Sequence, residues 1–212
     1  WTANRLLHQP AVTSLARCPL LLAPCLLRRM LLIEDGQVPD SVREVVHGGR
    51  CVVLVGSGLS ASVYPAWWKL VAQLCETCGV SADISHDSPA EDLLEAAEEA
   101  KQADPDGYRA LLDECFGRMI DQVPSTYHLL LRLPFGSFLT HNFDRLLSTA
   151  ASIAGKEFTV HAYPNLDRRR MEPGSIHNLH GWVPEGGGLV EGQIMLSSSD
   201  FEEASRASIA LA

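Results

Sequence analysis

The sequence predicts an α/β protein with a Rossmann-like parallel sheet that is flanked by helices. Two observations carry this prediction. Short apolar, β-branched runs alternate with helical patterns along the chain, which is typical of a parallel sheet. The clearest run, residues 51–55, stops at Gly56-Ser57-Gly58, and a helical pattern resumes a few residues later. A buried strand, a tight turn and a helix therefore follow one another near residue 56.

The elements are predicted in chain order. A first helix is expected over residues 40–47, with Asp40 or Ser41 as its N-cap, followed by a strand over 51–55. Helical patterns then cover 65–78, which is amphipathic, 89–100, which is acidic, 107–121 and 124–133. A strand over 137–140, a helix over 143–154, strands over 158–162 and 175–179, a glycine turn at 186–188 and a helix from about residue 200 complete the pattern. The helices between about 65 and 133 predict a small helical insert.

Two regions of the chain differ in composition. Residues 1–33 contain four arginines and no acidic residue, so they are a leader that is either transit-like or non-native, with Met30 as the natural start in the second case, which we favour. The Leu-rich stretch 20–27 contains Pro24 and is far shorter than the roughly 20 residues of a membrane span, so no membrane partner is expected. Residues 34–212 form the predicted folded domain.

Overall composition narrows the function classes. A hydrophobic content of 46% and a charged content of 20% are those of a globular protein. A net charge of −9 argues against a general nucleic-acid binder, because phosphate contacts need clustered Lys and Arg. The six cysteines are too sparse for a disulfide framework, so reduced thiols and an intracellular, cytoplasmic location are expected, or a mitochondrial one if the leader is genuine.

Polar residues follow three of the predicted strands. Gly56, Gly58 and Ser60 follow the first, Asn142 and Asp144 the second, and His180 the last. Because ligands bind beside the carboxyl ends of parallel strands, these groups are expected to converge on one crevice. Backbone N–H groups of the glycine turn, near the positive end of a helix dipole, suit a diphosphate. An ordinary strand–helix loop is the alternative, since a full G-x-G-x-x-G is absent.

In this pattern the chain resembles the sirtuin superfamily. Residues 56–60, Gly-Ser-Gly-Leu-Ser, are similar to the sirtuin Gly-Ala-Gly-x-Ser turn, and residues 140–144, Thr-His-Asn-Phe-Asp, to its Thr-x-Asn-hydrophobic-Asp element. Residues 179–181, Leu-His-Gly, are similar to the segment that holds the catalytic histidine. The stretches that lead into residue 140 and cover 194–202 are closer to the sirtuin-like NAD-cleaving domains of anti-phage defence proteins. Family members continue beyond this point, which implies a C-terminally truncated domain.

The resemblance implies roles that the chemistry of the residues suits. Gly56, Ser57, Gly58, Ser60 and Thr140 would bind NAD. Asn142 suits a ribose hydroxyl or a water, because an amide both donates and accepts hydrogen bonds.

The remaining two site residues have alternative interpretations. Asp144 would stabilise positive charge or orient a neighbour, and His180 would act as a base toward a ribose hydroxyl. Helix capping by Asn142 and Asp144, and a turn role for His180, are the structural alternatives. His141, His161 and His177 have no comparable support, and strand alternation points His177 away from His180.

The chain departs from the pattern of deacylating sirtuins, which favours the NAD-cleaving branch of the family. No cysteine follows Cys115, and Cys75 and Cys78 form one pair on a predicted helix, so no zinc site is expected. We therefore expect an NAD glycohydrolase that releases nicotinamide and ADP-ribose. The alternatives are a non-catalytic NAD or ADP-ribose sensor or filament-forming module, and, with less support, an NAD-dependent protein deacylase. A homo-oligomer or filament is a further expected assembly.

Overall fold

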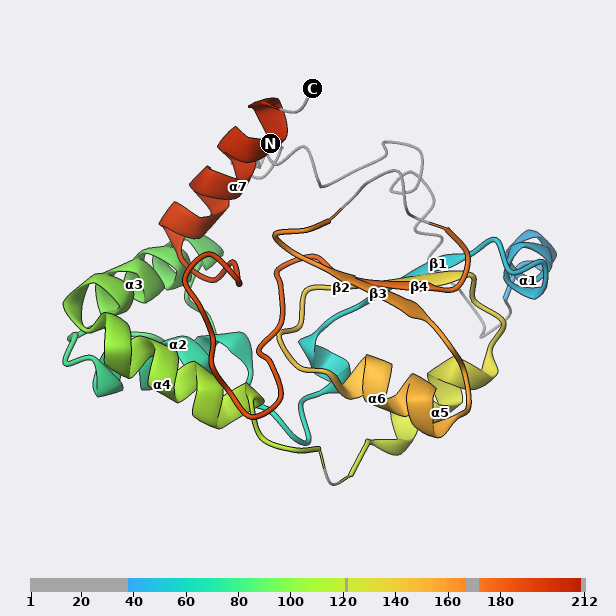
Figure 1. Cartoon of the computed structure of the whole chain (residues 1–212), viewed down its shortest axis with the longest axis horizontal. Helices are drawn as coiled ribbons and strands as arrows, with labels where there is room; N and C mark the ends of the chain where they lie inside the picture. Colours follow the sequence, from blue (N-terminus) through green and yellow to red (C-terminus); the bar gives the residue numbers. More distant parts are fainter. Residues whose placement is uncertain (1–37, 121, 167–171, 211–212) are drawn as a thin grey trace, which may run out of the picture.

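The computed structural model describes residues 38–120, 122–166 and 172–210, with side chains as far as Arg206. Within these residues, β1 (Val52–Val55), β2 (Ser137–Thr140), β4 (Ser175–Asn178) and β3 (Thr159–Ala162) form one sheet in that order. Every neighbouring pair is parallel. Helices flank the sheet, so the predicted Rossmann-like α/β fold is confirmed (Figure 1).

The strands end in register at one edge of the sheet. Val55 pairs with Thr140, Thr140 with Asn178, and Asn178 with Ala162. The loops that follow β1, β2 and β4 therefore leave the sheet side by side, as the sequence predicts. In Figure 1 this edge faces the cluster formed by α2, α3 and α4.

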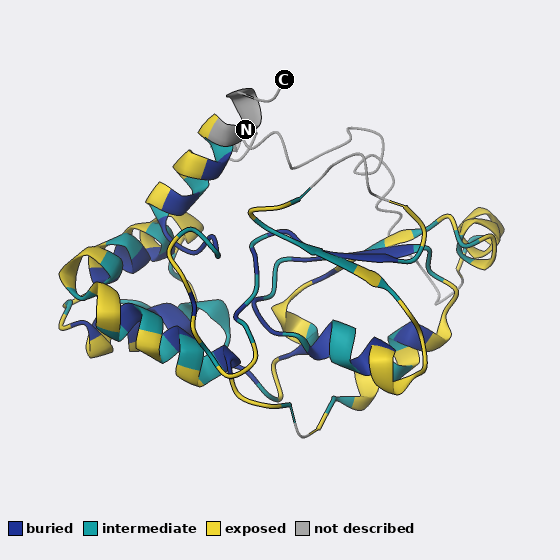
Figure 2. Cartoon of the chain, in the orientation of Figure 1, coloured by how far each residue is buried: buried dark blue, intermediate teal, exposed yellow. Residues whose placement is uncertain are grey.

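Helices α5 (Ser125–Arg132) and α6 (Leu146–Ile153) contact each other and lie against one face of the sheet (Figure 1). The inward faces of these helices and of the strands are buried (Figure 2). Their largest fully buried side chains are Tyr127, Phe138, Leu131, Leu146, Ile176 and Val55. Large apolar side chains supply most of the stabilisation here, at about 25 cal/mol per Å² of buried apolar area.

A separate helical cluster occupies the end of the molecule beyond the strand termini. It contains α2 (Trp67–Thr77), α3 (Ala90–Ala103) and α4 (Pro105–Phe116), and α7 (Ser198–Ala210) packs against α3. We call α2–α4 the helical lobe. The predicted insert at about 65–133 also contains α5, which packs with α6 rather than with the lobe (Figure 1).

Several helix ends differ from the predictions. Helix α1 spans Asp40–His47 as predicted, but Pro39 occupies its N-cap and no side chain caps it. Helix α4 begins earlier than predicted, at Pro105, because Asp104 accepts a hydrogen bond from the Gly107 amide. Helix α2 ends at Thr77, so Cys78 is its C-cap and not a helix residue.

The proposed leader, residues 1–33, lies outside the described residues. In the part of the chain that the structure covers, no helix combines the length and apolarity needed to cross a membrane.

Candidate functional site

The turn after β1 exposes its backbone. Gly56, Ser57 and Gly58 are exposed, and a Cβ at either glycine would meet no atom within 4 Å. Ser57–Leu59 form a single 3-10 turn, η4, and the next α-helix starts only at Trp67. The helix dipole expected beside this turn is therefore limited to one 3-10 turn. The open backbone remains free to approach a ligand.

Ser60 closes this turn and points into the protein. Its side chain is only 2% exposed. Ser60 Oγ donates a hydrogen bond to Asp144 Oδ2 at 2.7 Å and accepts one from Asn142 Nδ2 at 3.0 Å. The hydroxyl of Tyr127 lies 2.8 Å from the same oxygen. The structure thus brings Ser60, Asn142 and Asp144 together, and it adds Tyr127 from α5.

Asp144 links this cluster to the start of α6. Its Oδ1 accepts a hydrogen bond from the amide of Leu146 at 2.9 Å, which explains why the helix begins at Leu146 and not at Phe143. Burial raises the pKa of Asp144, while the Ser60 hydroxyl and the Leu146 amide oppose that shift. Arg145 occupies the N-cap position of α6 and no side chain caps it, so Asp144 is not the N-cap, although its carboxylate accepts the first helical amide and contacts Ser60 at the same time.

Thr140 and Asn142 shape the loop after β2. Thr140 is buried, and its Oγ1 accepts a hydrogen bond from the Asn142 amide at 3.1 Å. The Asn142 side chain is half-buried, and it caps no helix in the described structure. Thr140 thus supports the backbone of the loop, while Asn142 lies between the buried cluster and the surface.

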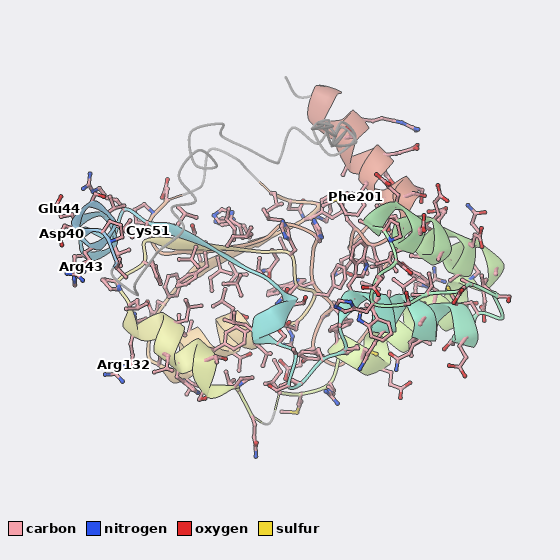
Figure 3. The ribbon with its side chains drawn as sticks, turned by 180° about the vertical axis from the view of Figure 1, so that it is seen from behind. Asp40, Arg43, Glu44, Cys51, Arg132 and Phe201 are labelled. Carbon is pink, nitrogen blue, oxygen red and sulfur yellow. The ribbon has the colours of Figure 1, made fainter. Side chains whose placement is uncertain are left out.

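His180 lies in the loop after β4, stacked on His141. The two ring centroids are 4.5 Å apart and the ring planes differ by 27°. Phe201, at the start of α7, meets His180 edge-on with centroids 5.1 Å apart (Figure 3 labels Phe201). Burial lowers the pKa of His180 to about 3, and the neighbouring His141 adds to the shift. Burial likewise lowers the pKa of His141. Both rings therefore favour their neutral form.

Backbone contacts fix the loop that carries His180. The carbonyl of His180 accepts a hydrogen bond from the Met195 amide at 2.9 Å, and Gly181 forms a bridge with Ile194. Gly181 has a φ of +83°, and a Cβ there would lie 2.1 Å from the Gln193 carbonyl oxygen. Glycine is needed at this position for both reasons.

Aromatic rings connect the helical lobe to the strand-end loops. Phe116 of α4 stacks on Tyr64 at 5.1 Å and meets Phe143 edge-on at 5.8 Å. Asp113, one turn earlier on α4, accepts hydrogen bonds from the amides of Gly188 and Leu189. The lobe is thereby packed against segments that lie between and after the predicted site residues.

The other candidate groups lie elsewhere. His177 stacks on His161 at 4.9 Å, and its Nε2 lies 2.8 Å from Ser175 Oγ, so it is separate from the His141–His180 stack. Cys75 and Cys78 are buried, and their thiols lie near backbone carbonyls. Among the described residues, no group of three or more His, Cys, Asp or Glu side chains could hold a metal ion.

A cavity of about 360 Å³ lies between α3, α4 and the start of α7. It is lined by residues that include Lys101, Tyr108, Ile194 and Asp200. None of the predicted site residues is in its lining, so this cavity is separate from the strand-end loops.

The sequence patterns did not predict the contact of Tyr127 with Ser60 or the stacking of His141 on His180. His141 stands directly before Asn142 in the same loop, and that position was the available signal. Tyr127 lies on α5, before that loop in the sequence. Its spacing of one helical turn from Leu131 predicts only an ordinary residue on the buried face of the helix. Only the packing of α5 against the sheet brings its hydroxyl to Ser60.

Comparison with curated proteins finds two distant similarities. The NAD(+) hydrolase ThsA of Bacillus cereus (strain MSX-D12) is 24% identical over 171 residues, which are 78% of this chain and 34% of that protein. The defense-associated sirtuin 2 of Bacillus subtilis is 27% identical over 139 residues, which are 63% of this chain and 14% of that protein. The chain thus spans about a third or less of the length of either relative. No family model matches the sequence.

Proposed function

We propose that this domain binds NAD at the carboxyl edge of its sheet and hydrolyses the bond between nicotinamide and ribose. The observation that carries the proposal is the convergence of three loops. The in-register ends of β1, β2 and β4 bring the open Gly56–Gly58 backbone, the Asn142 amide and the neutral His180 ring to one edge. The name of the Bacillus cereus relative, an NAD(+) hydrolase, supports the same activity.

The open turn supplies the anchor for the substrate. Gly56 and Gly58 have space where a side chain would stand, and Ser57 begins a 3-10 turn whose first amides lack partners within that turn. Backbone N–H groups bind the oxygens of a diphosphate without needing a basic side chain. This accounts for NAD binding by a chain with a net charge of −9.

The chemistry is a substitution at the anomeric carbon of the nicotinamide ribose. The C1′–nitrogen bond breaks, and its electron pair leaves on nicotinamide, whose ring nitrogen becomes neutral. The ribose then carries oxocarbenium-like positive charge, as in glycoside hydrolysis. Water adds to C1′ and releases one proton, so NAD and water give nicotinamide, ADP-ribose and a proton.

Each residue has a role that its environment allows. The Asn142 amide holds a ribose hydroxyl, and Asp144 acts on Asn142 both directly and through Ser60. The negative charge of Asp144 also favours the positive charge that develops on the ribose. His180 offers a neutral ring nitrogen as a hydrogen-bond acceptor to a ribose hydroxyl, since its pKa of about 3 keeps it unprotonated near neutral pH. The same low pKa makes the ring a weak base, so its role is to orient that hydroxyl.

The test is nicotinamide release from NAD by the purified protein without any peptide. Asn142→Ala and His180→Ala should each reduce the rate by about 100-fold, the scale of a lost preorganised hydrogen-bonding group. His161→Ala is the matched control, because it removes one ring from the other stacked histidine pair. Its rate should equal that of the wild type.

The competing functions give different outcomes. Nicotinamide release only with an acyl-lysine peptide would identify a deacylase and overturn the proposal. Binding of NAD by the folded protein without turnover would identify a sensor or assembly module. Equal rates for Asn142→Ala and wild type would place the site elsewhere.

A further inference from the structure

The oxygen of Ser60 is a point where three side chains meet. Asp144 Oδ2 lies 2.7 Å away, the Tyr127 hydroxyl 2.8 Å and Asn142 Nδ2 3.0 Å. A serine hydroxyl has one proton to donate and two lone pairs that accept. Three partners therefore use its full hydrogen-bonding capacity.

The direction of each bond follows from this count. An ionised Asp144 only accepts, so it takes the single proton of Ser60. The remaining two partners must then donate to Ser60 Oγ: Tyr127 gives its hydroxyl proton and Asn142 gives an N–H. A reversed Asn142 amide would set its carbonyl oxygen against Ser60 Oγ with no proton between them, which is unfavourable in a buried site.

The outward atom of Asn142 is thereby determined. Its Oδ1 accepts no hydrogen bond from any residue that the structure describes, and the side chain is half-buried at the edge of the strand-end loops. Tyr127 is fully buried, with 0% exposure, so it acts on any ligand only through the side chains that it contacts, Ser60 and Asn142. The same geometry gives Asn142 an acceptor pointing away from the buried cluster.

We propose that Tyr127 is a positioning residue which, through Ser60, locks the Asn142 amide with its carbonyl oxygen toward the ligand, where it accepts a hydrogen bond from a ribose hydroxyl. This inference rests on the proposed function, because that function supplies the ribose. Without the Tyr127 hydroxyl, one lone pair of Ser60 is released and the Asn142 N–H has two alternative acceptor positions. The amide then loses its single orientation.

A double-mutant cycle tests the coupling between Tyr127 and Ser60. Tyr127→Phe removes only the hydroxyl and should lower kcat by about five- to tenfold, the scale of one neutral hydrogen bond, with KM for NAD within about twofold. Ser60→Ala should lower kcat further. Adding Tyr127→Phe to Ser60→Ala should change nothing more, because residues that act as a unit are non-additive.

The matched control is Tyr108→Phe. Tyr108 is buried in the helical lobe, and its hydroxyl has no hydrogen-bond partner among the described residues. Its removal should leave kcat and KM unchanged. Additive effects of Tyr127→Phe and Ser60→Ala, or an equal loss in Tyr108→Phe, would overturn the positioning role.

A second readout separates this inference from the proposed function. The side-chain ¹⁵N–¹H resonances of Asn142, assigned by their loss in Asn142→Asp, should exchange slowly with water in the wild type and in Tyr108→Phe. They should exchange at least about tenfold faster in Tyr127→Phe and Ser60→Ala, because a locked amide is protected. Unchanged exchange in Tyr127→Phe would overturn the inference even if NAD is cleaved.

The remaining outcomes are also distinct. A wild type that releases no nicotinamide refutes the proposed function, and the amide exchange still decides the role of Tyr127. If Tyr127→Phe does not fold, two measurements on the wild type decide the role of Tyr127. A Tyr127 hydroxyl proton with a cross-peak to the Asn142 side-chain amide supports the lock, and an Asn142 amide that exchanges as fast as free asparagine refutes it.

Discussion

The rings of His141 and His180 lie nearly face to face, with centroids 4.5 Å apart and planes 27° from parallel. They come from the loops after β2 and β4, two neighbouring strands of the sheet. Neither ring makes a side-chain hydrogen bond to another described residue, so His180 is oriented by its contacts with His141 and Phe201. Neither of these two contacts places a carboxylate against the His180 ring, so neither raises the basicity of His180.

This relationship predicts how His180 titrates. Its pKa is lowered from 6.5 to about 3, first by burial and then by His141, so its C2-proton resonance should not shift as the pH passes through 6.5. Free histidine added to the sample should titrate normally and serves as the control. A midpoint near 6.5 for His180 would show that the ring is solvated in solution.

The same pKa shift predicts a loss of stability in acid. Between pH 6.5 and about 3 the unfolded chain binds a proton at His180 and the folded chain does not, so the free energy of unfolding falls as the pH falls through this window. His180→Phe should reduce that slope in urea unfolding at a series of pH values. An unchanged slope would assign the acid sensitivity to other groups.

The sequence predicted the strands of the sheet and the convergence of part of the candidate site. β-branched runs that stop at polar loops identified the strands to within a residue or so, because this pattern is local. The convergence of Ser60, Asn142 and Asp144 follows from the parallel direction of the strands. Their proposed roles in NAD cleavage remain predictions.

Such local patterns did not predict contacts between residues that are far apart in the sequence. Tyr127 and Ser60 are separated by 67 positions, and their hydrogen bond depends on how α5 packs beneath the sheet. The start of α6 was placed too early, because a helical period does not reveal that the Asp144 side chain accepts the Leu146 amide. Likewise, no periodicity indicates that His141 turns toward His180.

Asp144→Asn should separate stability from activity. Burial raises the pKa of Asp144 above its ordinary 3.8. Stability therefore falls as the pH rises from 3.8 to that raised pKa, and above it the ionised buried carboxylate destabilises the folded state. The neutral amide removes that cost. Its oxygen can still accept the Leu146 amide, but its NH2 group then faces Ser60 Oγ, and the Ser60 proton loses its acceptor. Because the two effects oppose each other, we expect a Tm at neutral pH within a few degrees of that of the wild type.

The activity of the same variant should fall by about 10- to 100-fold, because the Ser60 proton loses a charged acceptor. Asp106→Asn is the control, since this exposed α4 carboxylate lies outside the cluster. A Tm several degrees below that of the wild type would mean that the carboxylate stabilises the fold on balance.

Gly181→Ala should destabilise the loop that carries His180. The position combines a φ of +83° with a carbonyl oxygen only 2.1 Å from the new Cβ, so the free energy of unfolding should fall by about 3 kcal/mol or more. Gly186→Ala is a matched control, with a φ of +84° and open space, and should cost about 1 kcal/mol. Equal losses in urea unfolding would show that the loop yields to the clash.

Lys101 and Asp200 test whether the start of α7 supports the site. Asp200 is buried. Its Oδ1 accepts a hydrogen bond from Lys101 Nζ at 2.7 Å, and its Oδ2 accepts hydrogen bonds from the amides of Leu196 and Ser197. Phe201, the next residue, packs edge-on against His180. Lys101→Met leaves the carboxylate without its cation and should lower the free energy of unfolding by about 1–3 kcal/mol. This is less than the loss for a fully buried ion pair, because Lys101 is 26% exposed.

The same substitution should reduce nicotinamide release at saturating NAD, because a loosened α7 no longer holds Phe201 against His180. Arg206→Met provides the control on the same helix, since the Arg206–Glu202 pair is largely exposed and should contribute little to stability. Lower stability with full activity in Lys101→Met would show that the His141 stack alone suffices to orient His180. A parallel loss in Arg206→Met would instead point to a general dependence on helix α7.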